Sequence, residues 1–497
     1  MNGFRALLCA LACLPATALL PGAPAQAAFA CRHLEADTRR AMAGWQVPGL
    51  AVGIVRDGIP AARFVLGVRD AETRLPVTPK TLFGTGSLTK SLTALGIAVA
   101  AHENRVRLDR PVQQVLPYFP AGVSLRHLLS HTAGWPRHDA LWYLDRYGRR
   151  ELAEKLALLP HFARGGKAFQ YNNVPFAAAG VALAEATGTT WDAWIRAKIL
   201  DPAGMTDAVT TLAGFRNAAN RAAPYFPAAD GRISVPLRDT DPVGPAAGLY
   251  AHLDDMLKYL ALLATDGLVG RTRRLPAAAI RTIRTPVTPR YGLGLRIATW
   301  NGAEMAFHPG FIDGYGARLS ILPGSGSGVV VLSNLSGETP AAQIVSQTAL
   351  DCLTGAARTD WVARFGHRRP PPEMPPPPPA PSPPERDAAV YTGSFDHAAY
   401  GRLEFRTTGS GQLAGRFHGR DFRLDYAGQD RWRLTETHWP LREGLVFAFE
   451  DPVAGAPGVE RFARVSAPLA DGPTYRHNAG PISFDRTVLH SPATTPD

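Results

Sequence analysis

A serine and a lysine stand three residues apart at the start of a very apolar segment. Ser87 and Lys90 fall within FGTGSLTKSLTALGIAVA, residues 83–100, whose leucines recur at helical spacing. In a helix these two side chains lie one turn apart on one face. A serine hydroxyl becomes a good nucleophile when a base takes its proton, and a lysine shielded from water can serve as that base. The pattern predicts either a catalytic pair or a polar helix start with an exposed lysine.

Two further segments carry residue types that such a nucleophile needs. Tyr171 and Asn173 directly precede a predicted helix, and His308 precedes Gly310 between predicted strands. A phenol or an imidazole can pass a proton, and an amide can orient an amine. Each residue alone is typical of packing. In this order, together with the serine and lysine, they indicate acyl-transfer chemistry.

The elements that must position these residues are predicted from hydrophobic periodicity. A first helix spans residues 31–46, and GLAVGIVRDG and AARFVLGVRD form a hairpin after it. Helical patterns then cover 87–103, 124–130, 150–158, 174–187, 190–199 and 252–265. Strand-like runs return at 291–297, 317–323 and 327–334, and a last helix covers 340–353. We expect an α/β fold: one antiparallel sheet flanked by helices, an all-helical lobe, and a catalytic crevice between them.

Composition divides the chain into four parts. Residues 1–27 are typical of a cleavable signal peptide, and 28–367 form the hydrolase-like domain. The proline-rich stretch 368–387 predicts a semi-rigid linker. Residues 388–497 alternate apolar and polar positions, which predicts a small β barrel with a disordered tail. No later run is long enough to span a membrane, so we expect a periplasmic or secreted protein without stable membrane insertion.

Charge and cysteine content narrow the classes of function. The formal net charge is +11, but the arginines are scattered and no nucleic-acid-binding motif is present, so no nucleic-acid partner is expected. No cofactor is indicated, and His131 and His138 stand too far from other ligands to predict a metal. Cys31 and Cys352 remain after signal cleavage, either as a disulfide or as two separate thiols. Oligomeric state is not indicated.

Three motifs resemble those of the serine beta-lactamase-like family, which includes class C beta-lactamases, penicillin-binding DD-carboxypeptidases, D-aminopeptidases and related esterases. They are Ser87-Leu88-Thr89-Lys90, Tyr171-Asn172-Asn173 and His308-Pro309-Gly310. Further stretches also match, at 124–136, 198–208, 246–260 and 328–334. The resemblance covers about residues 31–355, and the tail more loosely resembles a lipocalin-like domain.

The resemblance implies a role for each matching residue. Ser87 would attack a carbonyl and become acylated, with Lys90 and Tyr171 sharing the role of general base. Asn173 would orient the lysine and the substrate amide. His308 would support the proton network or bind a substrate carboxylate. The backbone N–H groups of Ser87 and Phe311 would form the oxyanion hole.

The family's substrates differ, and one departure guides the choice among them. Class C beta-lactamases carry a lysine where this chain has His308, and histidine is mostly neutral at pH 7. The histidine favours a peptidase or amidase on D-amino-acid peptides, including peptidoglycan-derived ones, or an esterase. A beta-lactamase is the alternative enzyme. A non-catalytic protein that binds or senses peptidoglycan is the alternative of another class.

Three aromatic residues of the predicted helical lobe are candidates for the mouth of the crevice. Trp135, Trp142 and Tyr143 would suit hydrophobic acyl groups there, or else they pack in the core. Other hydrolase classes lack their motifs, because neither a Gly-x-Ser-x-Gly elbow nor a His-Glu-x-x-His zinc site occurs.

Overall fold

The computed structural model describes most of the chain. It covers residues 31–143, 147–161, 168–228, 231–336, 339–366, 384, 386–408, 412–436, 446–454, 460–467 and 482–486. The predicted signal peptide, nearly all of the proline-rich linker and residues 487–497 of the predicted tail lie outside the described residues. Among the helices of the described part, none is long and apolar enough to cross a membrane.

The central sheet is antiparallel and has the strand order β2-β1-β12-β11-β10-β9. Its strands are β1 (Gly49–Arg56), β2 (Ile59–Gly67), β9 (Arg296–Trp300), β10 (Ala303–Ile312), β11 (Tyr315–Leu322) and β12 (Ser327–Ser333). Leu50 of β1 lies opposite Ser333 of β12. The first hairpin and the late strands therefore form one sheet, as the sequence predicts.

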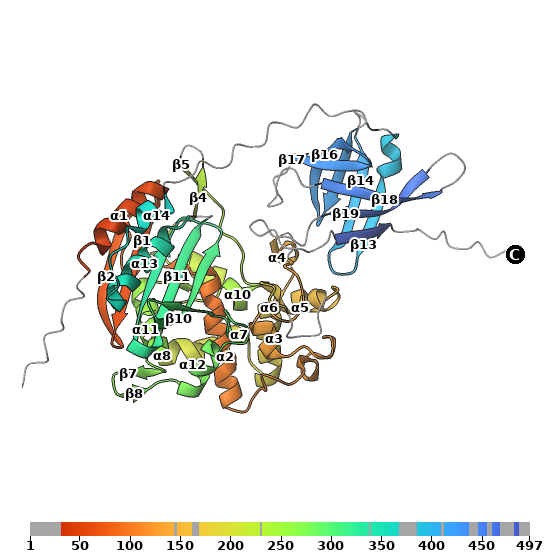
Figure 1. Cartoon of the computed structure of the whole chain (residues 1–497). Helices are drawn as coiled ribbons and strands as arrows, with labels where there is room; N and C mark the ends of the chain where they lie inside the picture. Colours follow the sequence, from red (N-terminus) through yellow and green to blue (C-terminus); the bar gives the residue numbers. More distant parts are fainter. Residues whose placement is uncertain are drawn as a thin grey trace, which may run out of the picture.

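Both faces of this sheet are buried, which explains the unbroken apolar runs of β1 and β12. On β12, Val330 packs into the core shared with the helical lobe, and Val331 packs into a second core on the opposite face. The helices on this second face are α1 (Leu34–Trp45), α13 (Ala341–Thr354) and α14 (Trp361–Phe365) (Figure 1). Helix α11 (Leu253–Ala264) packs on the first face.

The helical lobe is inserted between β2 and β9. Its helices are α2 (Thr89–His102), α3 (Leu125–Leu129), α4 (Ala140–Tyr143), α5 (Arg149–Ala157), α6 (Val174–Thr187), α7 (Trp191–Ile195), α8 (Asp201–Ala203), α9 (Leu212–Asn217), α10 (Gly244–Ala247) and α12 (Ala277–Arg284). This part also contains three short helical segments, η1 (Gly86–Leu88), η2 (Val112–Gln114) and η3 (Arg196–Leu200). Its small strand pairs are β3 (Phe83–Gly84) with β6 (Tyr250–Ala251), β4 (Tyr225–Ala228) with β5 (Gly231–Ser234), and β7 (Leu268–Val269) with β8 (Thr272–Arg273). Helix α2 is buried on every side from its first residue to Ala100, so it is the centre of the domain.

Strands β9 and β10 of the central sheet differ from the sequence prediction, and β9 spans Arg296–Trp300 rather than 291–297. His308, Pro309 and Gly310 lie inside β10 rather than between strands. A proline removes a donor from the sheet, so it is tolerated only where its nitrogen needs no partner. Pro309 meets this condition, because the last pair between β10 and β9 is Phe307 with Arg296. Beyond that pair, the edge of β10 on the β9 side is open.

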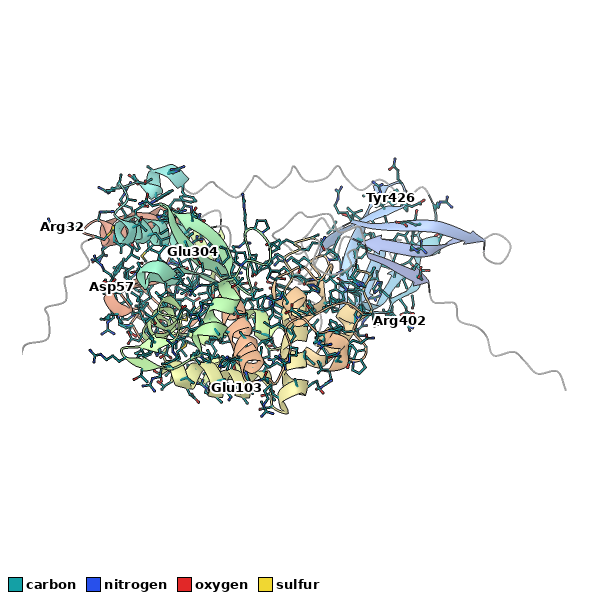
Figure 2. The ribbon with its side chains drawn as sticks, turned by 60° about the horizontal axis from the view of Figure 1, so that its bottom comes forward. Arg32, Asp57, Glu103, Glu304, Arg402 and Tyr426 are labelled. Atoms are coloured by element: carbon teal, nitrogen blue, oxygen red, sulfur yellow. A yellow bond between two sulfur atoms is a disulfide. The ribbon has the colours of Figure 1, made fainter. Side chains whose placement is uncertain are left out.

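The C-terminal segment forms a closed antiparallel barrel, again as the sequence predicts. The short turn η5 (Ala388–Tyr391) precedes the barrel, just as η4 (Pro323–Ser325) lies between β11 and β12 of the first domain. The strands of the barrel are β13 (Gly393–His397), β14 (Gly401–Thr407), β15 (Leu413–Phe417), β16 (Arg420–Gly428), β17 (Arg431–Glu436), β18 (Val446–Ala454), β19 (Glu460–Ala467) and β20 (Ile482–Arg486). The barrel lies against α4 and α5 of the helical lobe (Figures 1 and 2). Its core is aromatic, with Phe395, Phe405 and Phe449 in mutual contact.

A disulfide joins the two ends of the first domain. Cys31 precedes α1 and Cys352 lies in α13, and their Cα atoms are 5.7 Å apart. The bond closes a loop with a sequence separation of 321 residues. Of the two possibilities left by the sequence, the structure has the bridge.

Removal of this disulfide should lower the thermal stability of the first domain. We expect the double variant Cys31→Ser, Cys352→Ser to lose about 2–4 kcal/mol of unfolding free energy, because the unfolded chain regains the freedom of a long loop. Thermal unfolding of both proteins with and without reductant measures this. Reductant should destabilise the wild type and leave the double variant unchanged. An equal melting temperature for both oxidised proteins would contradict the prediction.

Candidate active site

The nucleophile candidate lies in a tight turn that leads into α2. Ser87 belongs to η1, and α2 begins at Thr89, two residues later than predicted. The Nζ atom of Lys90 is 3.0 Å from Ser87 Oγ. Lys90 is fully buried, so the alternative of a polar helix start with an exposed lysine does not describe this segment.

Tyr171 and Asn173 reach the same two side chains from the start of α6. The phenol of Tyr171 donates to Ser87 Oγ at 2.7 Å. Asn173 Oδ1 accepts from Lys90 Nζ at 2.7 Å. The intervening residue turns the other way, since Asn172 Oδ1 accepts from the backbone N–H of Val174 at the helix start. Residues far apart in sequence thus meet at one hydroxyl.

The surroundings of Lys90 favour its neutral form. Burial lowers the pKa of Lys90 well below its ordinary value, and the nearby guanidinium of Arg137 lowers it further. Besides Ser87, its hydrogen-bond partners among the described residues are two carbonyl oxygens, Asn173 Oδ1 at 2.7 Å and Ala246 O at 3.1 Å. A neutral amine has two N–H donors and one lone pair. The two donors satisfy the carbonyls, which leaves the lone pair for the hydroxyl proton of Ser87.

The surroundings of Tyr171 favour its protonated form. Burial raises the pKa of Tyr171 to about 12, although its hydrogen bond to Ser87 and the charge of Arg137 act in the other direction. The phenol is therefore protonated at neutral pH and serves as a donor to Ser87 Oγ. In the resting site Lys90 is placed to take a proton and Tyr171 to give one.

The backbone around Phe311 supports the predicted oxyanion hole. Ile312 and Tyr315 flank a two-residue turn, so Ile312 and alternate residues before it bond to β11. The backbone groups of Phe311 must then point to the open edge of β10. A Cβ atom added at Gly86 would lie 2.8 Å from the nitrogen of Phe311, and Gly86 has a φ of +51°. Gly86 therefore lets this backbone approach the turn that carries Ser87.

His308 lies in a directional chain of hydrogen bonds beneath Tyr171. Asn172 N–H donates to His131 Nδ1, so the other nitrogen of His131 carries the proton and donates to the phenol oxygen of Tyr291. Tyr291 O–H then donates to His308 Nε2 at 3.1 Å, and His308 Nδ1–H donates to Pro309 O. Burial lowers the pKa of both histidines well below its ordinary value, which agrees with this neutral chain.

Of the two roles expected for His308, this chain favours support of the proton network over binding of a substrate carboxylate. Both ring nitrogens have protein partners, and the side chain is only 1% exposed. The ring therefore has no spare N–H for a substrate carboxylate, and it carries no charge to attract one. His308 packs near Tyr171, with 6.1 Å between the two ring centres. The ring centre of His131 is closer to that of Tyr171, at 4.3 Å.

Motif analysis of the sequence did not identify the acidic residue next to this centre. Asp139 is fully buried, and its Oδ1 accepts from Asn173 Nδ2 and from Trp142 Nε1, each at 2.9 Å. Its other oxygen pairs with Arg137. Burial alone would raise the pKa of Asp139, but Arg137 and these hydrogen bonds hold it below the ordinary value. An ionised Asp139 fixes the amide of Asn173 so that its oxygen faces Lys90.

The three candidate aromatic residues are placed differently from one another. Trp135 is 1% exposed and packs between Phe119 and His161, so it belongs to the core. Trp142 is 4% exposed and holds Asp139. The prediction that Trp135 and Trp142 line the mouth of the crevice is wrong, because both side chains are buried in the apolar interior of the lobe. Tyr143 is half-buried, and its hydroxyl donates to Asp313 beside the turn between β10 and β11.

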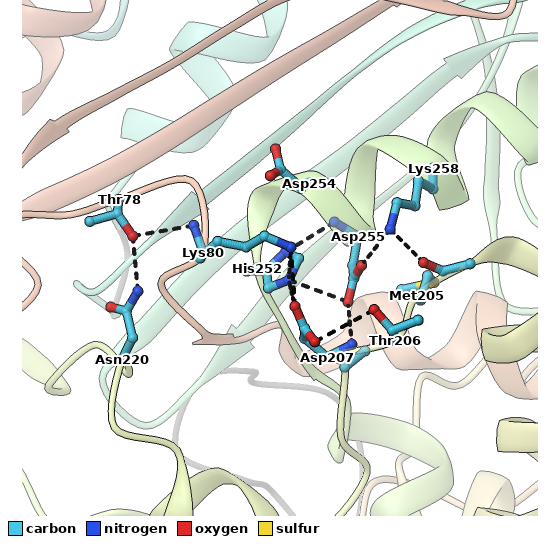
Figure 3. Close-up of polar contacts among 12 residues, drawn as sticks. Thr78, Lys80, Met205, Thr206, Asp207, Asn220, His252, Asp254, Asp255 and Lys258 are labelled. Atoms are coloured by element: carbon cyan, nitrogen blue, oxygen red, sulfur yellow. Dashed lines mark hydrogen bonds and ion pairs between the residues drawn. The ribbon is translucent and has the colours of Figure 1, made fainter.

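A second polar cluster, away from Ser87, joins three segments (Figure 3). His252 begins α11 and accepts the N–H of Asp255 at Nδ1, so its Nε2–H donates to Asp207, at 2.9 Å. Lys80 pairs with Asp207 and Lys258 pairs with Asp255. The three ligand-type residues Asp207, His252 and Asp255 could in principle hold a metal. The two ammonium groups already balance the carboxylates, so the cluster is a structural clamp.

Comparisons with known proteins agree with this geometry. A family model described as Beta-lactamase matches residues 34–351. The chain is 28% identical over 319 residues to the unguisins hydrolase ungD' of Aspergillus campestris, covering 58% of this chain and 59% of that protein. It is 28% identical over 352 residues to a D-aminopeptidase of Gluconobacter oxydans, covering 65% of this chain and 62% of that protein. The chain thus spans less than two thirds of these two relatives.

Solved structures share the fold over nearly their whole length. The octameric penicillin-binding protein homologue from Pyrococcus abyssi has a TM-score of 0.59 at 23% identity, covering 88% of this chain and 98% of that chain. SurE has a TM-score of 0.56 at 22% identity, covering 92% of this chain and 99% of that chain. The family match spans the sheet, the helical lobe and every residue that meets at Ser87, and the chain belongs to the Beta-lactamase family.

Proposed function

We propose that the protein is a serine hydrolase that forms an acyl-enzyme on Ser87 and cleaves amide bonds in D-amino-acid-containing peptides. The observation that carries the proposal is the single hydrogen-bonded chain from Lys90 through Ser87 Oγ to Tyr171. It has a buried amine on one side of the nucleophile and a protonated phenol on the other. The D-aminopeptidase among the relatives supports a peptide substrate, and the unguisins hydrolase supports a hydrolytic activity.

The proposed reaction follows from the protons in the site. Lys90 takes the hydroxyl proton of Ser87, and Oγ forms a bond to the substrate carbonyl carbon. The N–H groups of Ser87 and Phe311 bind the resulting oxyanion. Tyr171 gives a proton to the departing amine and regains one from the lysine side of the network. Water then attacks the acyl-enzyme in the reverse sequence of proton transfers, releasing the acid and restoring Ser87.

The site is less suited to the alternatives. A beta-lactam carries a carboxylate, and the neutral, buried His308 offers that group no cation. An esterase would use the same nucleophile and oxyanion hole, so only substrates separate it from an amidase. A binding protein would have no need of a buried amine whose pKa is lowered well below its ordinary value.

We also infer that the protein works outside the reducing cytoplasm. The disulfide between Cys31 and Cys352 supports this, because such bonds persist in oxidising compartments. The basic, apolar start of the sequence is consistent with export.

A panel of substrates tests the proposed activity. We expect hydrolysis of D-alanyl-p-nitroanilide in preference to its L enantiomer, and labelling of Ser87 by a fluorophosphonate. Ser87→Ala should lower kcat by at least ~10³-fold and abolish labelling. Turnover of p-nitrophenyl esters alone would identify an esterase, and turnover of nitrocefin alone a beta-lactamase. A wild type that is neither labelled nor active on any of these would favour the binding protein.

The pH profile of kcat/KM should reflect the two proton-transfer groups. Lys90 must be neutral to act, so the rate should rise with pH through its pKa, on a limb well below pH 10.5. Tyr171 must be protonated, so no loss is expected until its pKa of about 12 is approached. Initial rates over a pH series measure this. An acid limb near the ordinary pKa of lysine would show that the amine is not the base in its buried state.

Tyr171→Phe should separate the two roles of acid and base. If the phenol protonates the leaving group, the variant should lose about 10²–10⁴-fold in kcat on an anilide. It should lose far less on a p-nitrophenyl ester, whose leaving group departs without a proton. Comparison of the two substrates with the same variant measures this. Equal losses on both would instead identify Tyr171 as the base for the nucleophile.

A further inference from the structure

A turn of the C-terminal barrel forms hydrogen bonds with the helical lobe. This turn, between β13 and β14, contains Ala398, Ala399 and Tyr400. Lys155 of α5 donates to Ala398 O at 3.3 Å, and Tyr147 donates to Ala399 O at 3.4 Å. Ala399 and Tyr400 are almost completely buried, whereas Ala398 is exposed.

Tyr400 of this turn contacts a buried histidine of the lobe. Its hydroxyl is 2.8 Å from Nδ1 of His138, and His138 is 2% exposed. The Nε2 atom of His138 is buried with no hydrogen-bond partner among the described residues. Burial lowers the pKa of His138 to about 4, so the ring is neutral and depends on Tyr400 for its one polar contact in the described part.

His138 lies between two residues that contact active-site side chains, since Arg137 lies over the ring of Tyr171 and Asp139 bonds to Asn173. Arg137 and Asp139 pair with each other, and Asp139 holds the amide of Asn173. Asn173 in turn accepts from Lys90. The same three-residue segment is therefore held from the barrel side by Tyr400 and contributes to the active site on its other side.

The segment needs such support because it has little structure of its own. It leads into α4, a helix of four residues, and a helix this short is not stable without outside contacts. Outside contacts of the segment include Asn173 on Asp139, Tyr143 on Asp313 and Tyr400 on His138. Of these three contacts, the one from Tyr400 comes from the barrel.

We propose that the barrel is a positioning element of the active site, with Tyr400 fixing His138 and so the Asp139 carboxylate that orients Asn173 against Lys90. This inference rests on the proposed function, because Lys90 matters only if Ser87 is acylated. Tyr400 is a positioning residue, since it touches none of the reacting groups.

Substitutions at Tyr400 in the full-length protein test the proposal, with a matched control inside the barrel. Tyr391→Phe is the control: Tyr391 is also a fully buried tyrosine, and its hydroxyl bonds to Asp430 within the barrel. We expect Tyr400→Ala to lower kcat/KM by at least tenfold, Tyr400→Phe by a few fold, and Tyr391→Phe to leave it unchanged. Circular dichroism and melting temperature show whether each variant is folded.

The acid limb of the pH profile gives a readout that simple destabilisation does not move. Groups near Lys90 that set its charge are Arg137, Asp139, Arg296, Tyr171, His131 and His308. If the segment loosens, water reaches the amine and the limb should move to higher pH in Tyr400→Ala. Hydrogen exchange of residues 137–143 should also increase.

The outcomes are distinct. A wild type without fluorophosphonate labelling would overturn the proposed function and leave no activity to position. A labelled, active wild type with unchanged kcat/KM, acid limb and hydrogen exchange in Tyr400→Ala would overturn the positioning role alone. A folded Tyr400→Ala with fewer active molecules but the wild-type acid limb would also overturn it, because that result indicates stability only.

Discussion

The burial of an amine without a counter-ion is the constraint on which this active site depends. Within the described residues, Lys90 touches a hydroxyl and two carbonyl oxygens but no carboxylate. An ammonium ion in such surroundings is costly, so burial shifts the equilibrium of Lys90 toward its neutral form. The sheet and the helical lobe are both needed to exclude water from this amine. The position of α2 between them is therefore a chemical requirement as well as a packing solution.

The polar groups around this amine follow the same principle of neutrality. The chain from Asn172 through His131 and Tyr291 to His308 satisfies each ring nitrogen and hydroxyl without a formal charge. A buried carboxylate close by, that of Asp139, is balanced by Arg137 and separated from Lys90 by the amide of Asn173. Asp139 thus orients the site without stabilising an ammonium through direct contact. An amide is a suitable spacer, since it accepts on one side and donates on the other.

The sequence predicted those elements whose apolar residues recur at a regular spacing within a short segment. Apolar runs such as GVVVLSN identified the buried strands, and the leucines after Ser87 identified α2. Tyr171 and Asn173 could be found because they flank a helix start in a recognisable order. Strand β10 was not predicted because it contains Pro309. A proline argues against a strand unless its nitrogen lies on an unpaired edge, and the sequence does not show which edge is unpaired.

Other features depend on contacts that sequence spacing does not reveal. The roles of Asp139 and Tyr291 come from partners distant in the sequence, Asn173 for the carboxylate and His131 and His308 for the phenol. Trp142 was misplaced for the same reason, since its partner Asp139 was unrecognised.

The pairing of β1 with β12 has a consequence for how the chain reaches its native state. Leu50 meets Ser333, so the main sheet cannot close until almost the whole first domain has been synthesised. Until then an apolar strand edge stays unsatisfied and open to association with other chains. The barrel strands mostly pair with their sequence neighbours, which costs less loop entropy. Assembly of the late-closing body is therefore the slow and aggregation-sensitive stage for this polypeptide.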